Sequence, residues 1–383
     1  MPHAGPERAA ATSAPQDFAS ARASPAAADR ARAPGAGPAA RQDGGRPAPA
    51  VRDPFLDNAK YLTILCVGVG HFLEPLSHGS RSTEALYFAI YAFHMPAFIL
   101  ISGYLSRSYT GTRNQVVRLI AGVALPYLMI QFCYTLFMRW AADDPDREFA
   151  FNKPGFALWF LVALFLWRLT TPLWKNLRHP LAVSLVVAVA ASMTPSMGED
   201  FSLMRMFQFL PFFVLGLLLR PEHFSFLGHR AVRAAALPIL LCALVVAYWA
   251  VPRMDPAWFG RTRSVDEFGV PTWAGVVMFV ALFGAGLLMS ACFLAWVPRR
   301  RTWFTALGAG TLYAYLLHIF LVKSSREFDW YEPEWLQQPL SRVLVVLLAC
   351  AVMTVLCTPV VRRAFRYLVE PRAGWLFVRV EGK

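Results

Sequence analysis

Long apolar runs separated by short polar segments make up most of the chain after residue 53. A membrane-crossing helix needs about 20 mainly apolar residues. Ten runs have roughly that length: 56–76, 84–104, 116–138, 156–174, 179–195, 204–220, 232–251, 272–297, 304–323 and 340–360. No connection between them suggests a separate soluble domain. The pattern predicts an all-α integral membrane protein with about ten transmembrane helices in one bundle, over residues 53–370.

The first run, LDNAKYLTILCVGVGHFLEPL, carries ionisable residues near both ends. Such residues are costly where a helix faces lipid. At about 100° and about 1.5 Å per residue, the steps from Lys60 to His71 return the helix almost to the same face, about 16 Å further along. Asp57 and Glu74 share that face. We therefore expect it to turn away from lipid and to form half of an active site.

The charged residues between the runs predict the orientation in the membrane. With the amino terminus inside, the inner connections and carboxyl-terminal tail hold these basic residues: Arg107, Arg113, Arg118, Arg168, Lys175, Arg178, Arg220, Arg230, Arg233, Arg299, Arg300, Arg301, Arg362, Arg363, Arg366, Arg372, Arg379 and Lys383. The outer connections hold the acidic residues Asp143, Asp144, Asp146, Glu148, Glu199, Asp200, Asp255, Asp266, Glu267, Glu327, Asp329, Glu332 and Glu334. This is the positive-inside pattern. It predicts a multi-pass protein of the plasma (inner) membrane with both termini cytoplasmic.

The composition supports a lipid partner and argues against other classes. Hydrophobic residues make up 56% and charged residues 16%, against about a quarter charged in soluble domains. The net charge of +13 is spread over short clusters, unlike the single basic patch of a nucleic-acid-binding protein. The six cysteines all lie inside apolar runs without the close spacing of metal or redox pairs. We expect no nucleic acid and no metal.

Both ends of the chain read as tails. Residues 1–52 are rich in Ala, Pro, Gly and Arg and contain one aromatic residue, Phe18. Such a segment buries too little apolar surface to offset the entropy of ordering it. It also lacks the apolar centre of a signal peptide. We expect a disordered cytoplasmic tail there, and a short basic cytoplasmic tail over residues 371–383.

Three histidines fall within the predicted spans. The orientation puts His71 and His318 in the outer third of the membrane and His94 near mid-depth, which suggests one polar cavity open to the exterior. An imidazole can accept a proton from a hydroxyl near neutral pH and pass it on. Glu74, one turn from His71, can orient its ring. The alternative is that these histidines hydrogen-bond neighbouring helices in a purely structural role.

Two basic residues at the inner side are candidates for binding an anionic donor. Lys60, with Asp57 one turn before it, can face a donor that enters from the cytoplasm, or it can simply extend toward the headgroups. Arg118 can bind phosphate through its planar guanidinium, or it can be an ordinary positive-inside anchor.

The second span suggests a cavity wall. Pro96 follows His94 by two residues and is expected to open the helix there. Ser102, Gly103 and Tyr104 follow at the inner end, where Gly103 permits close approach of a backbone or a ligand. A proline-kinked packing helix with a small-residue contact explains the same residues.

Several motifs in order along the chain resemble the membrane acyltransferase-3 family, in particular its branch similar to fucose 4-O-acetylases. They are LDNAKYL followed by GHF, then FHMPAFILISGYLSR, LWFLVALFLWR, RMFQFLPFFVLGLLLR and a late YLLH. The resemblance covers most of residues 53 to about 325. It implies a ten-helix membrane enzyme that moves an acyl group, usually acetyl, from cytoplasmic acyl-CoA to a hydroxyl of a sugar or other acceptor.

The resemblance also implies roles for single residues. His71 matches the first-helix histidine that acts as the base. Lys60 stands where many members have Arg, with Asp57 as its acidic partner, and so keeps the charge but loses the planar fork. Arg118 matches a basic residue that is a candidate for the CoA phosphates. The signature of this branch is matched at His94, Ser102, Gly103 and Tyr104, and the late YLLH contains His318.

These observations together predict an integral membrane O-acyltransferase, which we expect to move an acyl group, acetyl in the first place, from acyl-CoA onto a cell-envelope or secreted acceptor such as a carbohydrate. Direct attack of the acceptor and an acyl-His71 intermediate both fit the sequence. The alternative is a polytopic transporter or flippase for a sugar, lipid or small acid, which also uses kinked helices and intramembrane charges. A membrane scaffold would leave the polar face of the first run unexplained. The oligomeric state is not predicted.

Overall fold

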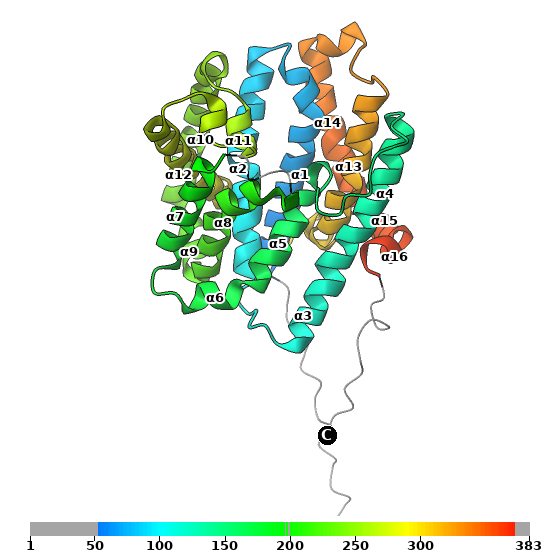
Figure 1. Cartoon of the computed structure of the whole chain (residues 1–383). Coiled ribbons are helices and arrows are strands. Elements are labelled where there is room, and N and C mark those ends of the chain that lie inside the picture. The colour runs from blue at the N-terminus through cyan, green and yellow to red at the C-terminus, as the bar shows by residue number, and fades with distance from the viewer. Residues whose placement is uncertain (1–52, 196, 198–199, 372–383) are drawn as a thin grey trace, which may run out of the picture. The chain divides into compact units, whose positions relative to one another are not determined.

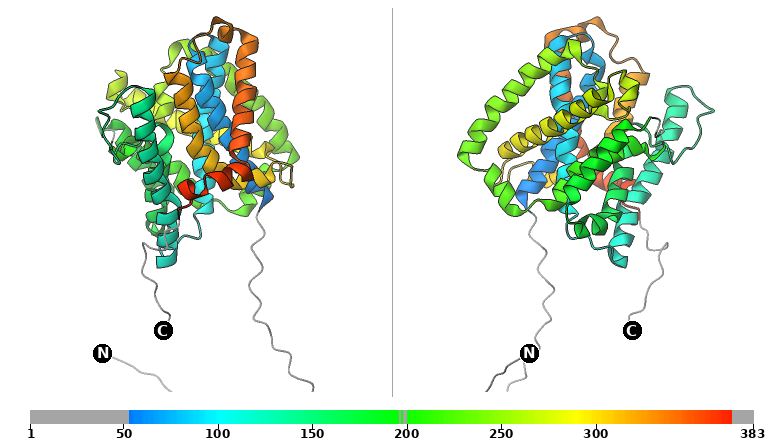
Figure 2. Two further views of the ribbon diagram at one scale, coloured as in Figure 1. Left: turned by 90° about the vertical axis from the view of Figure 1, so that its right-hand side faces the viewer. Right: turned by 60° about the vertical axis from the view of Figure 1, so that its left-hand side comes forward.

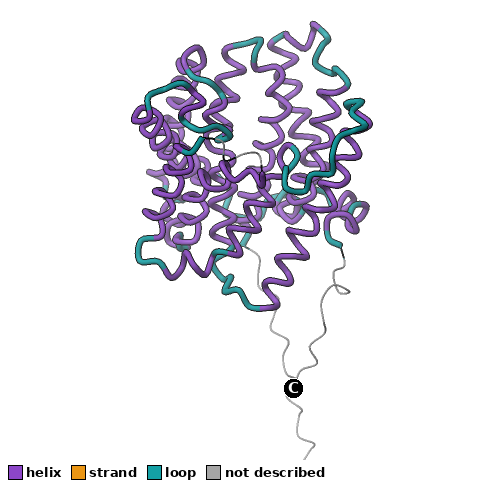
Figure 3. Tube along the Cα trace, viewed as in Figure 1, coloured by secondary structure: helices purple, strands orange, loops and turns teal. Residues whose placement is uncertain are grey.

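A computed structural model describes residues 53–195, 197 and 200–371. The predicted tail 1–52, and all of the predicted tail 371–383 except Pro371, lie outside these residues. Within the described part, every regular element is a helix, and Figure 3 shows helices joined by loops without a strand. The predicted all-α class is therefore confirmed for that part of the chain.

The elements follow one another along the chain and are labelled in Figure 1. They are α1 (Pro54–Ser77), α2 (Arg81–Leu105), α3 (Arg113–Leu119), the π-helix η1 (Ile120–Ala124), α4 (Leu125–Ala141), η2 (Phe156–Leu158), α5 (Trp159–Leu169), α6 (Thr171–Asn176), α7 (Pro180–Met193), η3 (Asp200–Ser202), α8 (Leu203–Leu218), α9 (Pro221–Leu227), α10 (Arg230–Ala250), η4 (Val251–Arg253), α11 (Ala257–Gly260), η5 (Asp266–Phe268), α12 (Thr272–Trp296), η6 (Thr305–Ala309), α13 (Thr311–Glu327), η7 (Glu334–Gln337), α14 (Pro339–Leu356), α15 (Pro359–Ala364) and α16 (Arg366–Val369). Each of the ten predicted runs contains a helix.

Among the described residues, six helical stretches are long and apolar enough to cross a membrane. They are Arg81–Leu105, Arg113–Ala141, Asp200–Leu218, Arg230–Arg253, Thr272–Trp296 and Pro339–Leu356, and two shorter apolar helices cover Phe156–Leu169 and Pro180–Met193. The first run, α1, is not one of the six, because its polar residues lower its hydropathy. The chain is thus a multi-pass membrane protein by helix length and composition, and the number of ten crossings stays a prediction.

Helix α1 lies inside the bundle and packs against α2, α13 and α14, as the views in Figures 1 and 2 show. Asp57, Ile64 and Val67 on its predicted polar face are all buried, whereas Leu62 and Leu65 are half-buried. A helix surrounded by protein can carry ionisable groups because its neighbours, rather than lipid, meet them. Lys60, His71 and Glu74 on the same face are half-buried, and Tyr61, Thr63 and Leu73 on other faces are buried too. The helix is therefore enclosed on most sides, and burial alone does not single out the predicted face.

The ninth predicted run begins later than expected. The run was predicted over 304–323, but α13 starts at Thr311, and residues 305–309 form the short 3-10 helix η6. The cause is Asn58, a fully buried residue of α1. Its side-chain amide donates to the carbonyls of Pro298 and Arg300 at 2.8 and 3.0 Å and accepts from the hydroxyls of Thr302 and Thr305 at 3.2 and 2.7 Å. These bonds fold the loop against the start of α1.

Pro96 does not interrupt α2, which runs continuously from Arg81 to Leu105. Proline removes one backbone hydrogen bond in the preceding turn, and here the Ala92 carbonyl lies against Gly286 of α12. A Cβ at Gly286 would come within 2.9 Å of that oxygen. The predicted opening of the helix at Pro96 is therefore not seen, and Gly286 of α12 packs closely against the Ala92 carbonyl instead.

Helices α2 and α8 approach each other closely at Gly103 and Gly216. A Cβ at Gly103 would overlap the Phe213 carbonyl oxygen and lie 3.1 Å from the Cα atom of Gly216. Small residues at such crossings let backbones come together in membrane proteins. The glycine predicted to permit a close approach does so for a helix in this structure.

We expect Gly103→Ala to destabilise the protein because the added methyl group has no room at the α2–α8 crossing. Overpacking of this kind costs about 1–3 kcal/mol. The matched control is Gly284→Ala in α12, where nothing lies within 4 Å of the added Cβ. Thermal unfolding in detergent should show a lower midpoint for the first variant only. Equal midpoints for the two variants would contradict the tight crossing.

Candidate active site

A cavity of about 380 Å³ contains His71, Glu74 and His94. Its wall comes from α1, α2, the η2–α5 segment, α8, α13 and the connection between α10 and α12. The remaining lining residues are Val67, Tyr87, Tyr91, Met95, Phe156, Ala157, Trp159, Arg205, Phe209, Asp255, Pro256, Ala257, Phe259, Gly260, Arg263 and Tyr315. An aromatic wall with a few convergent polar groups is typical of a small-molecule site.

The polar groups of this cavity form a chain that starts at His71. Its Nδ1 lies 3.0 Å from the Tyr91 hydroxyl, which in turn lies 3.3 Å from Oε2 of Glu74. The direct distance from His71 Nδ1 to Glu74 Oε2 is 3.9 Å, which is too long for a hydrogen bond. Tyr91 therefore bridges the two residues that the sequence paired directly.

Arg326 of α13 holds the carboxylate at the end of this chain. Its Nη2 lies 2.9 Å from Glu74 Oε2 and also donates to the His71 carbonyl oxygen at 3.3 Å. An arginine at this distance favours the ionised carboxylate. An ionised carboxylate can only accept hydrogen bonds, so the Tyr91 hydroxyl donates its proton to Glu74.

The direction of these bonds determines the tautomer of His71. Once the Tyr91 hydroxyl donates to Glu74, its oxygen can accept from His71, so the His71 proton sits on Nδ1. A neutral imidazole carries one proton. Nε2 of His71 then has a free lone pair and can accept a proton from a ligand in the cavity.

The other two predicted histidines gather around His71. The ring centroid of His318 lies 5.6 Å from that of His71 and the centroid of His94 lies 6.5 Å away. In both residues Nδ1 is bonded to a backbone carbonyl one turn earlier, Ile90 for His94 at 2.9 Å and Ala314 for His318 at 3.1 Å. Their Nδ1 atoms are therefore donors, since a carbonyl oxygen only accepts. Nε2 of His318 is buried and has no hydrogen-bond partner among the described residues.

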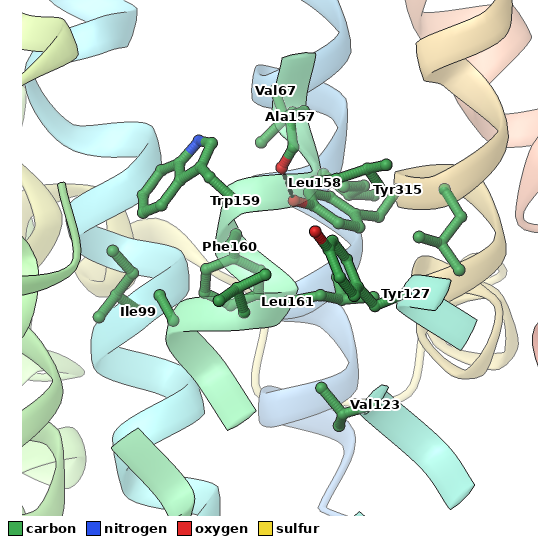
Figure 4. Packing of buried hydrophobic residues seen from close by; sticks show 14 of the residues in the cluster. Val67, Ile99, Val123, Tyr127, Ala157, Leu158, Trp159, Phe160, Leu161 and Tyr315 are labelled. Carbon is green, nitrogen blue, oxygen red and sulfur yellow. Dashed lines mark hydrogen bonds between the residues drawn. The ribbon is translucent and has the colours of Figure 1, made fainter. Parts of the chain in front are cut away.

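The segment that opens α5 forms another side of the cavity. Phe156 has a positive φ of 44°, which is unusual for a residue other than glycine. Its ring lies 4.7 Å from that of His71, and the Arg326 guanidinium lies 5.2 Å from its centroid. The Tyr315 hydroxyl of α13 donates to the carbonyl of Ala157, and Figure 4 shows both residues beside α1. These contacts fix the segment against the histidines.

A second, larger cavity of about 610 Å³ adjoins the first and shares Phe156 and Arg205 with it. It is lined by polar residues of α4, of the connection between α4 and η2, of η3, and of the connection between α10 and α12: Gln131, Thr135, Arg147, Glu148, Lys153, Ser202 and Thr262 among them. Gln131 holds the connection by donating to the carbonyls of Ala150 and Lys153 at 3.0 and 3.1 Å and accepting from the Gly155 amide at 2.9 Å.

The connection between α10 and α12 covers the histidine cavity and is held by Arg261. This arginine is only 6% exposed. Its guanidinium lies 4.9 Å from the ring centroids of Phe209 and Phe279, and Nη1 donates to the Gln208 carbonyl at 3.2 Å. Burial lowers the pKa of Arg261 to about 9, so the group remains protonated at neutral pH. Cation–π contacts with aromatic faces stabilise that charge.

Asp57 and Lys60 lie at the other end of α1. Lys60 Nζ is 2.7 Å from Asp57 Oδ1, and Asp57 is buried. The Asp57 carboxylate therefore balances much of the Lys60 charge within the same helix. The structure does not bring this pair into the histidine cavity, in agreement with the separation of about 16 Å expected along a helix.

Arg118 lies in a separate pocket of about 250 Å³ at the same end of the bundle as the start of α1, because α1 and α2 are antiparallel and α3 follows α2 directly. Arg168 lines the same pocket and donates from Nε to the Ser106 hydroxyl at 3.0 Å. The hydroxyl of Tyr109, also in the wall, is buried without a hydrogen-bond partner in the described part of the chain. Two guanidiniums and an unused hydroxyl suit an anion.

Ser102, Gly103 and Tyr104 lie away from the histidines, at the end of α2 that packs on α8 and α9. The Ser102 hydroxyl donates to the Phe98 carbonyl at 2.8 Å. The Tyr104 ring packs edge-on against Phe224 of α9 at 4.7 Å. None of the three lines the histidine cavity, and their contacts account for helix packing at this end.

Sequence reasoning missed Tyr91, Arg326 and Arg205. Tyr91 lies three residues before His94 and so on nearly the same helix face, a spacing that would have suggested it. Arg326 is 252 positions from Glu74, and nothing in the local pattern separates it from an ordinary charged residue at a helix end. Arg205 stands at the start of an apolar run, where it also resembles an ordinary charged residue at a helix end. Among the described residues, no group of three His, Cys, Asp or Glu side chains could hold a metal ion.

The acyltransferase-3 family model, described as an acyltransferase domain, matches residues 53–362. The match covers most of the chain, and the protein belongs to this family. The resemblance seen in the sequence is therefore confirmed at the level of the family. No curated protein and no solved structure matches the chain.

Proposed function

We propose that this protein is an O-acyltransferase in which His71 is the general base, with acyl-CoA as donor and a hydroxyl compound as acceptor. Membership of the acyltransferase-3 family supports the transfer of an acyl group by a membrane protein. The observation that carries the role of His71 is its hydrogen-bonded chain to Tyr91 and Glu74, which leaves Nε2 free to accept a proton inside a cavity.

In the proposed reaction, Nε2 of His71 takes the proton of the acceptor hydroxyl while the hydroxyl oxygen attacks the thioester carbonyl. The new ester bond forms, the carbon–sulfur bond breaks, and His71 returns the proton to the departing thiolate. During the step the imidazole becomes positively charged. The chain through Tyr91 to the Glu74 carboxylate stabilises that charge and keeps the ring in place, as a carboxylate partner does for other catalytic histidines.

The end of the bundle near Arg118 suits the phosphates of the donor. Arg118 and Arg168 line one pocket there, whereas Lys60 is already paired with Asp57 at 2.7 Å. We therefore assign the main phosphate contact to the arginine pocket, and to Lys60 a supporting role along the path to His71. The separation of about 16 Å between Lys60 and His71 along α1 is within reach of an extended pantetheine arm.

The finer features of the proposal follow the charge pattern and the family resemblance. The protein spans the plasma membrane about ten times with both termini cytoplasmic, takes up acetyl-CoA from the cytoplasm, and acetylates a carbohydrate presented from outside. Within the family it belongs to the branch similar to fucose 4-O-acetylases. The polar lining of the cavity, with its aromatic walls, supports an acceptor of this class.

We expect His71→Ala to reduce acetyl transfer by about 10²- to 10⁴-fold, the usual contribution of a general base. The assay is transfer from radiolabelled acetyl-CoA to a panel of methyl glycosides by the purified protein. His229→Ala is the matched control, because His229 is exposed and lines neither of the two cavities. Full activity of a folded His71→Ala variant would exclude His71 as the base.

We expect Tyr91→Phe to lower kcat by about tenfold or more with little change in KM for the donor, because the loss of the hydroxyl leaves His71 Nδ1 without its bridge to Glu74. Since the three residues form one chain, Tyr91→Phe and Glu74→Gln together should cost less than the sum of the single changes. Tyr248→Phe, at an exposed position on α10, is the control. Additive losses in the double variant would argue that Tyr91 and Glu74 act independently.

The proposed orientation predicts opposite labelling of two engineered cysteines in a Cys242→Ser background. Asp146→Cys, in the connection after α4, should react with a membrane-impermeant maleimide on intact cells. Asn176→Cys, at the end of α6, should react only after permeabilisation. Both native positions are exposed, so access depends on the side of the membrane. The reverse pattern would show that the orientation is inverted.

A further inference from the structure

The charged groups around the histidine cavity do not balance. Two carboxylates line it, and each has an arginine: Arg326 lies 2.9 Å from Glu74, and Arg263 lies 3.1 Å from Asp255. Arg326 reaches Glu74 from outside the lining, whereas Arg205 lines the cavity and has no carboxylate within ion-pair distance among the described residues. The three guanidiniums in and beside the wall therefore face two carboxylates, and Arg205 is the one without an ionic partner in that part of the chain.

Arg205 is held in place by groups that do not neutralise it. Its Nε donates to the Gly260 carbonyl at 3.1 Å, and its guanidinium lies 5.4 Å from the ring centroid of Trp159. Trp159 in turn stacks on Phe209 at 5.4 Å. These contacts fix the position of the side chain while the terminal N–H groups of the guanidinium remain available. A half-buried charge without an ionic partner is costly, which is a reason to expect a ligand there.

The neighbouring cavity also has charged residues in its wall, among them Arg147 and Glu148 besides Arg205. Arg147 approaches Asp144 only at 3.8 Å, and both of those side chains are well exposed. Because Arg205 lines both cavities, it stands between the larger cavity and the cavity that contains His71.

We propose that the acceptor carries a carboxylate or phosphate group besides its reacting hydroxyl, and that Arg205 binds this anionic group. This inference rests on the proposed acyltransferase function. Arginine suits the role because its planar fork can bind a carboxylate or a phosphate through two parallel hydrogen bonds. Arg205 and His71 line one cavity, so a single acceptor can place its anionic group on the first and its hydroxyl on the second.

Arg205 also gives the acceptor a fixed orientation. With the anionic group held, the hydroxyls of a sugar ring become distinguishable by their distance from Arg205, and one of them faces Nε2 of His71. The aromatic residues Phe156 and Trp159, which line the same cavity, can contact the apolar surface of the ring. The charge of Arg205, which lines both cavities, attracts anionic compounds toward the site, as charged clefts do in general.

The test compares three radiolabelled probes that share one ring: methyl α-D-glucopyranoside, its uronic acid, and its 6-phosphate. Binding to the purified full-length protein in detergent is measured by equilibrium dialysis without acyl-CoA. We expect at least one charged probe to bind about tenfold or more tightly than the neutral glucoside. Preference for the uronic acid identifies a carboxylate as the natural group, and preference for the 6-phosphate identifies a phosphate.

The variants separate a binding role from a structural one. Arg205→Gln should weaken binding of the preferred charged probe by about 10- to 100-fold without changing the dissociation constant of the neutral glucoside. Arg205→Lys should restore part of the loss because it keeps the charge. Arg253→Gln is the control, since Arg253 is exposed and lines neither cavity.

Either of two binding results would overturn the inference, and a transfer assay then separates it from the proposed function. One is equal binding of the charged and neutral probes by the wild-type protein, including no binding of any of them. The other is unchanged binding of charged probes by a folded Arg205→Gln variant. Transfer from labelled acetyl-CoA is then measured with the same probes: transfer to the neutral glucoside with an equal KM would leave the acyltransferase function standing and exclude the anionic acceptor. Charge-selective binding without any transfer would support the anion site and contradict the proposed function.

Discussion

The site depends on the hydrogen-bonded chain from His71 through Tyr91 to Glu74, which Arg326 completes. Ionisable groups within a membrane bundle must find partners in the protein, and this chain meets that requirement with residues from three helices, α1, α2 and α13. The ion pair at one end makes the carboxylate an acceptor. The direction of every bond then follows, and a free Nε2 on His71 is the result. Packing of α13 against α1 is thus also what prepares His71 for the base role that we propose.

Other contacts keep this chain in position. Asn58 holds the loop before α13 against the start of α1, which sets where α13 begins. The Tyr315 hydroxyl ties α13 to the segment that carries Phe156, and Phe156 packs on His71. At the opposite side, Arg261 holds the connection that covers the cavity through aromatic rings instead of a carboxylate. The cavity is therefore built from segments far apart in sequence, each fastened by a buried polar or cationic group.

The two ends of α1 have different surroundings. Near its start, Lys60 is paired with Asp57, and a pocket with Arg118 and Arg168 lies at the same end of the bundle. Near its other end lie the histidines, the guanidinium of Arg205 and the larger cavity. This separation fits a donor and an acceptor that approach from opposite sides. It also explains why the polar residues of α1 stand near the two ends of the helix with an apolar middle between them.

Much of the fold and part of the site could be predicted, because the patterns that indicate them are local in sequence. Apolar runs of membrane length predicted the helices, and the helical period placed Asp57, Lys60, His71 and Glu74 on one face, which is a property of the backbone alone. The family could be identified from ordered motifs. The predicted membrane depths of His71, His94 and His318 suggested that the three histidines share one cavity. The sequence could not distinguish Ser102 and Tyr104 from residues that only pack helices together. Their distance from the cavity depends on how α2 meets α8 and α9.

The sequence by itself therefore determined the all-helical membrane class, the family and the polar face of α1, because hydropathy and helical periodicity act over a few residues. Only the tertiary structure decided which groups meet that face. Arg326 is 252 positions from Glu74, and the hydroxyl of Tyr91 lies between two residues that are one turn apart on their own helix. His71 and Glu74 lie 3.9 Å apart on one helix, and the hydroxyl that bridges them comes from α2. Hydrogen bonding is sensitive to distance at that scale, and no local pattern in α1 encodes the position of Tyr91.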